Sequence, residues 1–167
     1  MDVTIRPAEP GDTAAMGSVW LRAALVGYEG IFPPEAPMPT VEAIANDWRE
    51  AIERPWGRAA YFVACDSGPD RTVVGTVAAV PDPDESVRGH LQALYVDPSH
   101  WGRGIGRALH DTALDHLSDA GFRVAVLWVL EANVRARAMY ERWGWRSAPA
   151  RQTEYRGVDE TCYIRTL

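Results

Sequence analysis

The stretch LYVDPSHWGRGIGRAL (residues 94–109) decides how this chain can fold. An apolar, strand-like segment runs into a helical pattern, and three glycines at alternate positions fill the join: Gly102, Gly104 and Gly106. Glycine is a poor helix former, so three of them at a helix start indicate that something approaches the backbone closely. The unpaired N–H groups of a first helical turn, at the positive end of the helix dipole, attract anions. The join therefore predicts a phosphate cradle.

Two arginines, Arg103 and Arg107, alternate with these glycines and can add charge-assisted contacts to a phosphate. The spacing matches neither the P-loop, GxxxxGK[ST], nor the dinucleotide fingerprint G-x-G-x-x-G. A dinucleotide site stays open as an alternative, because Glu131 ends the next apolar segment, where a ribose-binding acid would stand. A tight turn packed against a neighbouring segment is the other alternative.

Working outward from the join, alternating and buried-type apolar runs predict strands, and apolar residues at helical spacing predict helices. The predicted strands are residues 3–8, 59–66, 71–80, 87–96 and 123–130, with a final hairpin around Gly157. The predicted helices are residues 14–28, 40–52, the join to about 120, and 133–143. This order predicts a mixed sheet covered by helices.

The bulk composition narrows the class of protein. A chain of 167 residues with 47% hydrophobic and 24% charged residues suits one soluble globular domain. A net charge of −6 argues against nucleic acid or an anionic membrane as the main partner. The first residues lack a signal-peptide pattern, and the apolar run at 124–130 is too short to span a membrane, so we expect a cytoplasmic protein. Cys65 and Cys162 fit small buried residues of a reducing compartment.

Two segments, HLQALYVDPSHWGRGIGRAL (90–109) and LWVLEANVRARAMYERWGW (127–145), resemble the acetyl-CoA-binding core of the GNAT-family N-acetyltransferases. The resemblance is specific over residues 88–146, and the order of elements agrees over 1–167, as in a single N-acetyltransferase domain. It implies an α+β fold: a mixed, mostly antiparallel twisted sheet of six to seven strands flanked by four helices. It also implies acetyl-CoA as co-substrate and no metal.

The family pattern Q/R-x-x-G-x-G/A starts at Trp101 in this chain, where Gln or Arg is usual. The resemblance further implies that the strand before the cradle splays from its neighbour at a bulge, which leaves backbone groups for the pantetheine arm of the coenzyme. The implied coenzyme contacts are Leu94, Tyr95, Val96, Trp101, Gly102, Arg103, Gly104, Ile105, Gly106, Arg107, Asn133, Ala136 and Tyr140.

Acetyl transfer to an amine needs a base, an oxyanion donor and an acid for the leaving thiolate. By resemblance, Tyr140 is the acid and a backbone N–H near Tyr95 or Val96 is the oxyanion donor. A lysine-like amine has a pKa of about 10.4, so it must lose a proton before it attacks. His90, with an ordinary pKa of about 6.5, is the predicted base. The alternatives left open are Asp84, Glu85, Glu29 or a chain of waters.

In this family the loop after the first helix and the final hairpin select the acceptor. Both segments carry acids beside aromatic residues here, which suits a cationic amine, although a solvated acidic surface would look the same. The residues concerned are Tyr28, Glu29, Phe32, Glu35, Glu154, Tyr155, Asp159 and Glu160. Two other functions stay open: an acyl-CoA-binding or sensor module without catalysis, and a nicotinamide-dependent oxidoreductase. Seven tryptophans, several near the C-terminus, also suggest a homodimer.

Overall fold

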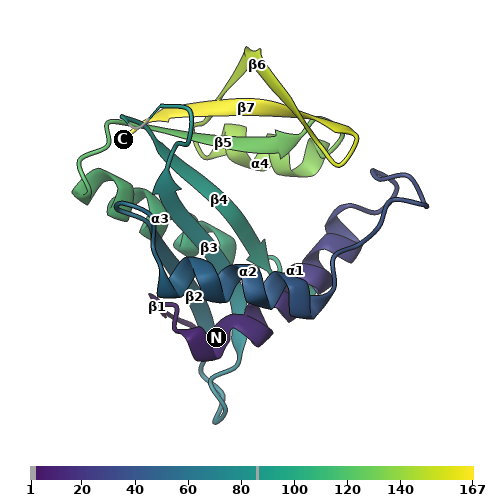
Figure 1. Cartoon of the computed structure of the whole chain (residues 1–167), viewed down its shortest axis with the longest axis vertical. Helices are drawn as coiled ribbons and strands as arrows, with labels where there is room; N and C mark the ends of the chain where they lie inside the picture. Colours follow the sequence, from purple (N-terminus) through teal and green to yellow (C-terminus); the bar gives the residue numbers. More distant parts are fainter. Residues whose placement is uncertain (1–2, 86) are drawn as a thin grey trace.

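The computed structural model describes residues 3–85 and 87–167, without the side chains of 149–152. Within these residues the chain forms one seven-stranded sheet, in the order β1-β2-β3-β4-β5-β7-β6, and four α-helices (Figure 1). The strands are β1 (Val3–Pro7), β2 (Ala60–Asp66), β3 (Val73–Pro81), β4 (Gly89–Val96), β5 (Val124–Leu130), β6 (Arg146–Tyr155) and β7 (Val158–Thr166). The helices are α1 (Thr13–Gly27), α2 (Val41–Glu53), α3 (Ile105–Asp119) and α4 (Val134–Arg142).

The predicted fold class is confirmed. Neighbouring strands are antiparallel except for β4 and β5, which are parallel. The predicted elements begin and end within about two residues of the observed ones, apart from β6. That strand begins at Arg146, well before the predicted segment at Thr153, and its sequence contains a proline. Proline argues against a central strand but is tolerated at a sheet edge, where β6 lies.

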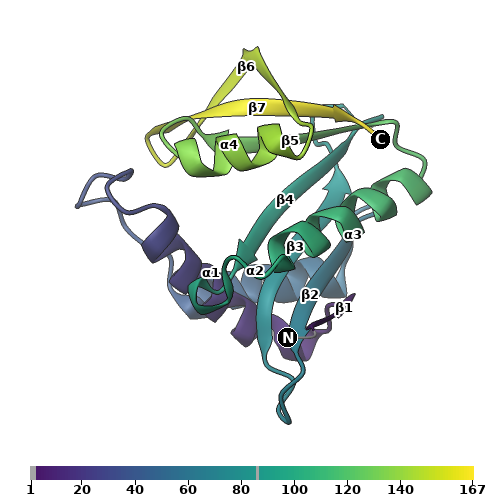
Figure 2. The ribbon, with the colours of Figure 1, turned by 180° about the vertical axis from the view of Figure 1, so that it is seen from behind.

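The sheet splits between its two parallel strands. β4 and β5 pair at Gly89 with Ala125 and at His90 with Val126. Both strands lie entirely within the described residues, and their other positions do not pair with each other. Beyond His90 the two strands diverge, which Figures 1 and 2 show as a widening angle between β4 and the layer of β5, β7 and β6. The predicted splay before the cradle is therefore confirmed.

A β-bulge in β4 accompanies this divergence. The register between β3 and β4 shifts between Thr76 and Ala78, so that Val77 faces two residues of β4, Ala93 and Leu94. Ala93 has φ of 53°, a left-handed conformation that costs a non-glycine residue roughly 1–2 kcal/mol. The bulge therefore holds the end of β4 away from β5 at a cost to the fold.

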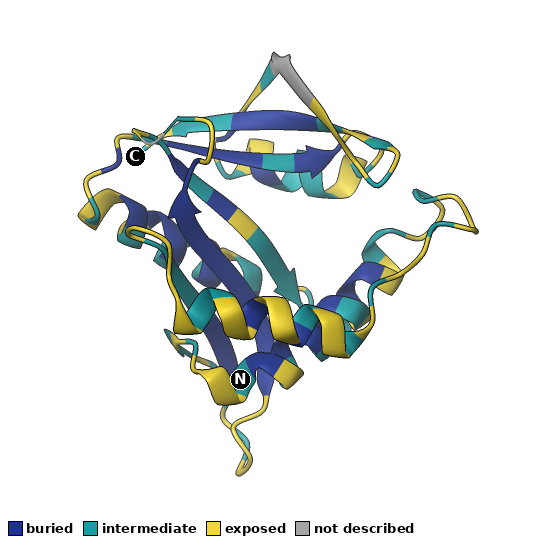
Figure 3. Ribbon diagram, viewed as in Figure 1, coloured by how far each residue is buried: buried dark blue, intermediate teal, exposed yellow. Residues whose placement is uncertain are grey.

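Helices cover both faces of the sheet. α1 and α2 pack on one face of the β1–β4 half, while α3 covers its other face and α4 lies on the same side against β5 and β7 (Figures 1 and 2). β3 is buried along its whole length between these layers (Figure 3). Gly89 lets α3 cross close to β4, because a Cβ there would lie 2.7 Å from Leu117. α3 is thereby fixed against the strand that precedes it.

The tryptophans do not gather in one exposed patch. Trp145 is buried in the core and Trp143 packs against His110, while Trp56 is 55% exposed in the loop between α2 and β2. The homodimer suggested by these residues stays a prediction. Among the described residues, no helix combines the length and apolar character required to cross a membrane.

Candidate functional site

The glycine join forms an open helix start. Gly102 and Gly104 have φ of 75° and 81°, values that an L side chain rarely adopts. The helical ladder begins where the N–H of Ala108 donates to the carbonyl of Gly104 at 3.0 Å. The N–H groups of the residues before Ala108 therefore have no carbonyl of the same helix to bond. Among the described residues, no atom lies within 4 Å of where a Cβ of Gly104 would be, its two chain neighbours aside.

The buried side chain of Ile105 anchors this helix start, since it is 3% exposed and packs in the core. The Nε of Arg107 donates to both carboxylate oxygens of Asp111, at 2.9 and 2.7 Å, so its two terminal nitrogens are the part that can reach an anion. Arg103 is exposed beside the same turn. The cradle thus combines open backbone with two arginines.

Trp101 does not cover the helix start. Its Nε1 donates to the carbonyl of Val96 at 2.7 Å, and the guanidinium of Arg135 lies 4.3 Å from the centre of the indole ring. The indole therefore joins the end of β4 to the first turn of α4. One lone pair of the Val96 carbonyl is used in this way, so Leu94 and Tyr95 are the better candidates for pairing with a pantetheine arm.

α4 brings the other predicted coenzyme contacts to the splay. Asn133 caps this helix, since its Oδ1 accepts from the N–H of Ala136 at 3.1 Å. Its amide nitrogen keeps two N–H groups that can donate to a ligand. The predicted N-cap is confirmed, and the coenzyme contacts of Asn133 and Ala136 stay predictions.

Tyr140 is 8% exposed, near the end of α4. Its ring packs edge-to-face on Trp143 and Trp145, with ring centres 6.0 and 6.3 Å away. Burial raises the pKa of its hydroxyl, and the nearby Tyr95 raises it further. Tyr140 therefore keeps its proton at neutral pH, as a general acid must.

His90 lies where β4 still pairs with β5, opposite Val80 on its other side. It is partly buried, on the closed side of the splay. Its role as base stays a prediction.

Aromatic side chains from three segments meet at the open end of the splay. The hydroxyl groups of Tyr28, which caps α1, and Tyr95 on β4 are 3.0 Å apart. Phe32 packs edge-to-face on Tyr28 at 5.5 Å and on Tyr155 at 6.1 Å. Arg156, in the β6–β7 turn, lies over the Phe32 ring at 4.9 Å. The loop after α1 is thereby joined to the final hairpin.

One half-buried carboxylate belongs to this group. Glu160 on β7 lies opposite Leu130 of β5, and its charge acts on the hydroxyl of Tyr95. Burial raises the pKa of Glu160 above its ordinary value of 4.5. A carboxylate that has lost water in this way binds an amine or a proton more strongly than an exposed one.

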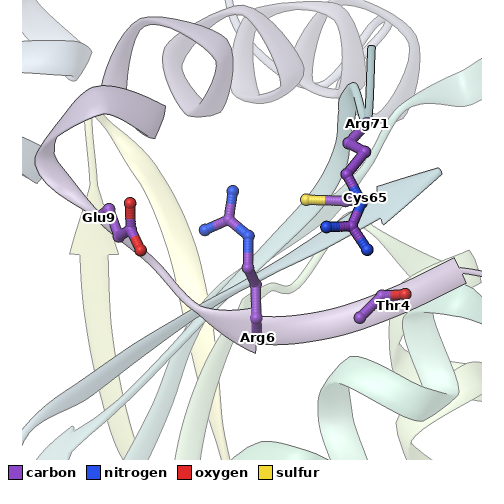
Figure 4. Close-up of a pocket in the computed structure, with 5 residues that line it drawn as sticks. All are labelled: Thr4, Arg6, Glu9, Cys65 and Arg71. Atoms are coloured by element: carbon purple, nitrogen blue, oxygen red, sulfur yellow. The ribbon is translucent and has the colours of Figure 1, made fainter. Parts of the chain in front are cut away.

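A separate hollow lies at the edge strand β1, remote from the splay in sheet order (Figure 4). Arg6 there donates two hydrogen bonds to Asp12, at 2.7 and 2.8 Å, so its charge is already paired. Cys65 lines the same hollow and is 2% exposed, and Cys162 is fully buried. The predicted burial of both cysteines is confirmed.

The sequence missed two features of the site. Tyr95 was expected to contribute only its backbone groups. The role of its side chain was missed, because a tyrosine in an apolar strand is usually a core residue. His110 on α3 was also missed, although it lies between the core positions Leu109 and Ala113 of the same helix, where a polar residue stands out. A histidine at a core position of this helix was the signal that could have identified His110 from the sequence.

The model of the acetyltransferase (GNAT) family matches residues 27–145 of the chain. Among curated proteins, the mycothiol acetyltransferase of Beutenbergia cavernae is 41% identical over 136 residues, covering 81% of this chain and 43% of that protein. The mycothiol acetyltransferase of Propionibacterium freudenreichii is 38% identical over 103 residues, covering 60% and 32%. The chain thus spans less than half the length of these curated relatives.

Solved structures share the fold. The PaiA N-acetyltransferase of Thermoplasma acidophilum, in complex with coenzyme A, has a TM-score of 0.80 at 18% identity, covering all of both chains. A putative acetyltransferase of Salmonella typhimurium, yncA, with acetyl-CoA, has a TM-score of 0.73 at 19% identity, covering 99% of this chain and 94% of the other. At these identities the likeness establishes the architecture alone.

Proposed function

Because the chain belongs to the GNAT family of acetyltransferases, we propose that it moves an acetyl group from acetyl-CoA to a primary amine. The transfer is direct, within a complex of the enzyme and both substrates. The single observation that carries this proposal is the splay between β4 and β5, which ends at an open glycine helix start. A parallel βαβ frame, which a nicotinamide site would need, is absent before the cradle, since β1 to β4 form an antiparallel meander within residues 3–85 and 87–96.

Backbone groups make most of the proposed contacts with the acetyl donor. The first N–H groups of α3 and the terminal nitrogens of Arg107 bind the diphosphate, and the edge of β4 at Leu94 and Tyr95, which does not pair with β5, takes up the pantetheine arm. Acetyl-CoA supplies the activated acyl group as a thioester. A backbone N–H at the end of β4 donates to the oxyanion, which needs no rearrangement because the bulge already holds it away from β5.

Two protons must move in this reaction. Tyr140 gives its hydroxyl proton to the departing thiolate, and burial supports this role because it keeps the hydroxyl protonated. His90 is the predicted base, and because it lies on the closed side of the splay it takes the proton of the ammonium by way of water. Glu160 stands on the acceptor side and holds the cationic amine beside Tyr95 before the proton leaves. No cysteine takes part, since Cys65 and Cys162 are buried in strands.

The acceptor is a small-molecule or peptide amine that enters between the loop after α1 and the β6–β7 hairpin. The aromatic walls formed by Tyr28, Phe32 and Tyr155 favour a cation, and Glu160 supplies the opposite charge. Arg156 at the same entrance repels a second positive charge on the acceptor, so we expect monoamines to react better than polyamines.

The test is a screen of the purified chain with acetyl-CoA and a panel of amines, with detection of the released thiol. The panel holds peptide α-amines, lysine side chains, amino sugars, monoamines and a polyamine. Amine-dependent thiol release, with an acetylated product identified by mass, supports the proposal. Stabilisation of the chain by coenzyme A with no thiol release from any amine would instead favour the binding or sensor module.

A further inference from the structure

A histidine on the cradle helix is buried and fully bonded. His110 lies on α3, shortly after the glycine join, and its exposed fraction is 0%. Its Nε2 accepts a hydrogen bond from the indole Nε1 of Trp145 at 2.8 Å. Its Nδ1 lies 2.8 Å from the carboxylate of Asp111. The proposed mechanism makes no use of this imidazole.

The partners fix a single form of the ring. An indole N–H can only donate, so Nε2 must be the lone-pair nitrogen and Nδ1 must carry the proton that Asp111 accepts. Burial alone would raise the pKa of Asp111, but hydrogen bonds from Arg107 and His110 hold it below its ordinary value. The carboxylate therefore stays ionised and keeps accepting. Burial lowers the pKa of His110, which keeps the ring neutral.

Both ends of this network reach groups of the proposed reaction. On one side, both carboxylate oxygens of Asp111 accept from the Nε–H of Arg107, one of the two arginines of the cradle. On the other side, the backbone N–H of Trp145 donates to the carbonyl of Tyr140 at 3.0 Å, and the two rings pack edge-to-face. Trp143 closes the group, with its ring centre 4.8 Å from that of His110 and 6.0 Å from that of Tyr140.

We propose that His110 is a positioning residue for acetyl transfer, which holds the diphosphate-binding helix start and the Tyr140 hydroxyl in one fixed relation. This inference rests on the proposed function. α3 packs on the β1–β4 half of the sheet, whereas Trp145 lies directly before β6 of the other half, so the His110–Trp145 bond crosses the split. A leucine could fill the same core position, but its packing would not fix the orientation of α3 relative to Trp145. The two hydrogen bonds of the neutral imidazole ring do fix that orientation.

The test compares two replacements that each keep one of these bonds. His110→Gln keeps an oxygen that can accept from Trp145, while His110→Asn keeps a donor for Asp111 but falls short of the indole. We expect His110→Asn to lower kcat by about 10- to 100-fold with little change in the KM for acetyl-CoA, because a small misplacement of the acid is costly. His110→Gln should recover most of that loss.

The same two variants are then made in Tyr140→Phe. If His110 acts through Tyr140, neither replacement lowers kcat further in that background. His116→Gln is the matched control, because His116 lies on the same helix and its Nε2 bonds to the backbone carbonyl of Arg58. Equal losses in His110→Asn and His110→Gln, or losses that multiply with that of Tyr140→Phe, would reduce His110 to a stabilising core residue and overturn the inference.

A measurement without turnover separates this inference from the proposed function. In nitrogen-15 spectra of the wild-type chain, added coenzyme A should shift the indole N–H signal of Trp145, and His110→Asn should abolish that shift. An unmoved Trp145 signal with coenzyme A bound overturns the coupling even if the enzyme is active. A chain that shows the shift but releases no thiol with any amine keeps the coupling and loses the proposed function.

Discussion

The two sides of the split sheet are built in different ways. The donor side, made of the end of β4, the glycine join and the start of α3, offers mainly backbone groups from one continuous stretch, residues 94–109. The acceptor side offers side chains from segments far apart in sequence: Tyr28 after α1, Tyr95 on β4, and Tyr155 and Glu160 on the final hairpin. The difference teaches that, in the proposed function, local backbone geometry binds the donor, while long-range packing selects the acceptor.

Tyr140 stands between the two sides, so its removal should have the largest effect. Tyr140→Phe removes the proton for the leaving thiolate, and we expect kcat to fall by about 100- to 1,000-fold. The KM for acetyl-CoA should change little, because the cradle is untouched. Steady-state kinetics with thiol detection measure both constants. An unchanged kcat would remove Tyr140 from the mechanism and leave the two sides without a shared acid.

The comparison predicts that one kind of substitution weakens the binding of a different substrate on each side. Gly104 and Gly157 share a left-handed φ, of 81° and 82°, and neither has an atom within 4 Å of its missing Cβ among the described residues, chain neighbours aside. Alanine costs roughly 1–2 kcal/mol of strain at either position. Gly104→Ala should raise the KM for acetyl-CoA by about 10-fold, as a Cβ enters the cradle.

Gly157→Ala is the matched variant on the acceptor side. It strains the β6–β7 turn beside Arg156, so it should raise the KM for the amine and leave that for acetyl-CoA nearly constant. Two variants that raise the same KM would show that the two sides are not independent.

This division also explains what the sequence could predict. The glycine join, the N-cap at Asn133 and nearly every element follow from local patterns, because glycine spacing, turns and periodicity act over a few residues. The splay was implied only by the resemblance to a known family, since no local pattern marks it. The contact of Tyr28 with Tyr95 and the burial of Glu160 depend on where the final hairpin meets the loop after α1, which local pattern does not encode. His110 was missed for the same reason: its partner Trp145 lies 35 residues away along the chain.

A smaller effect should identify the carboxylate of the acceptor side. Glu160→Gln removes the charge that we propose faces the amine, and we expect kcat/KM for the amine to fall by about 10-fold. Because burial raises the pKa of Glu160, the ionised carboxylate destabilises the folded chain at neutral pH. Glu160→Gln should therefore raise Tm at pH 7, and the difference should vanish below pH 4.5, the ordinary Glu pKa, where both states bind the proton.

Glu50→Gln, on the exposed face of α2, is the matched control and should change neither quantity. The variant His90→Ala separates the base from the amine-binding carboxylate. Loss of the acidic limb of the pH–rate profile in His90→Ala, but not in Glu160→Gln, supports His90 as base. A profile that His90→Ala leaves intact removes that assignment.

The smallest effect concerns the bulge that separates the two sides. Ala93 has a left-handed φ that glycine adopts without strain, so Ala93→Gly should raise the free energy of unfolding by about 0.5–1 kcal/mol. Ala79→Gly, in the extended and fully buried strand β3, should lower it by at least a similar amount. Urea unfolding of both variants measures whether the free energy of unfolding rises or falls in each. If both variants lose a similar free energy of unfolding, the backbone of Ala93 is not strained. The splay would then need a cause other than a strained bulge.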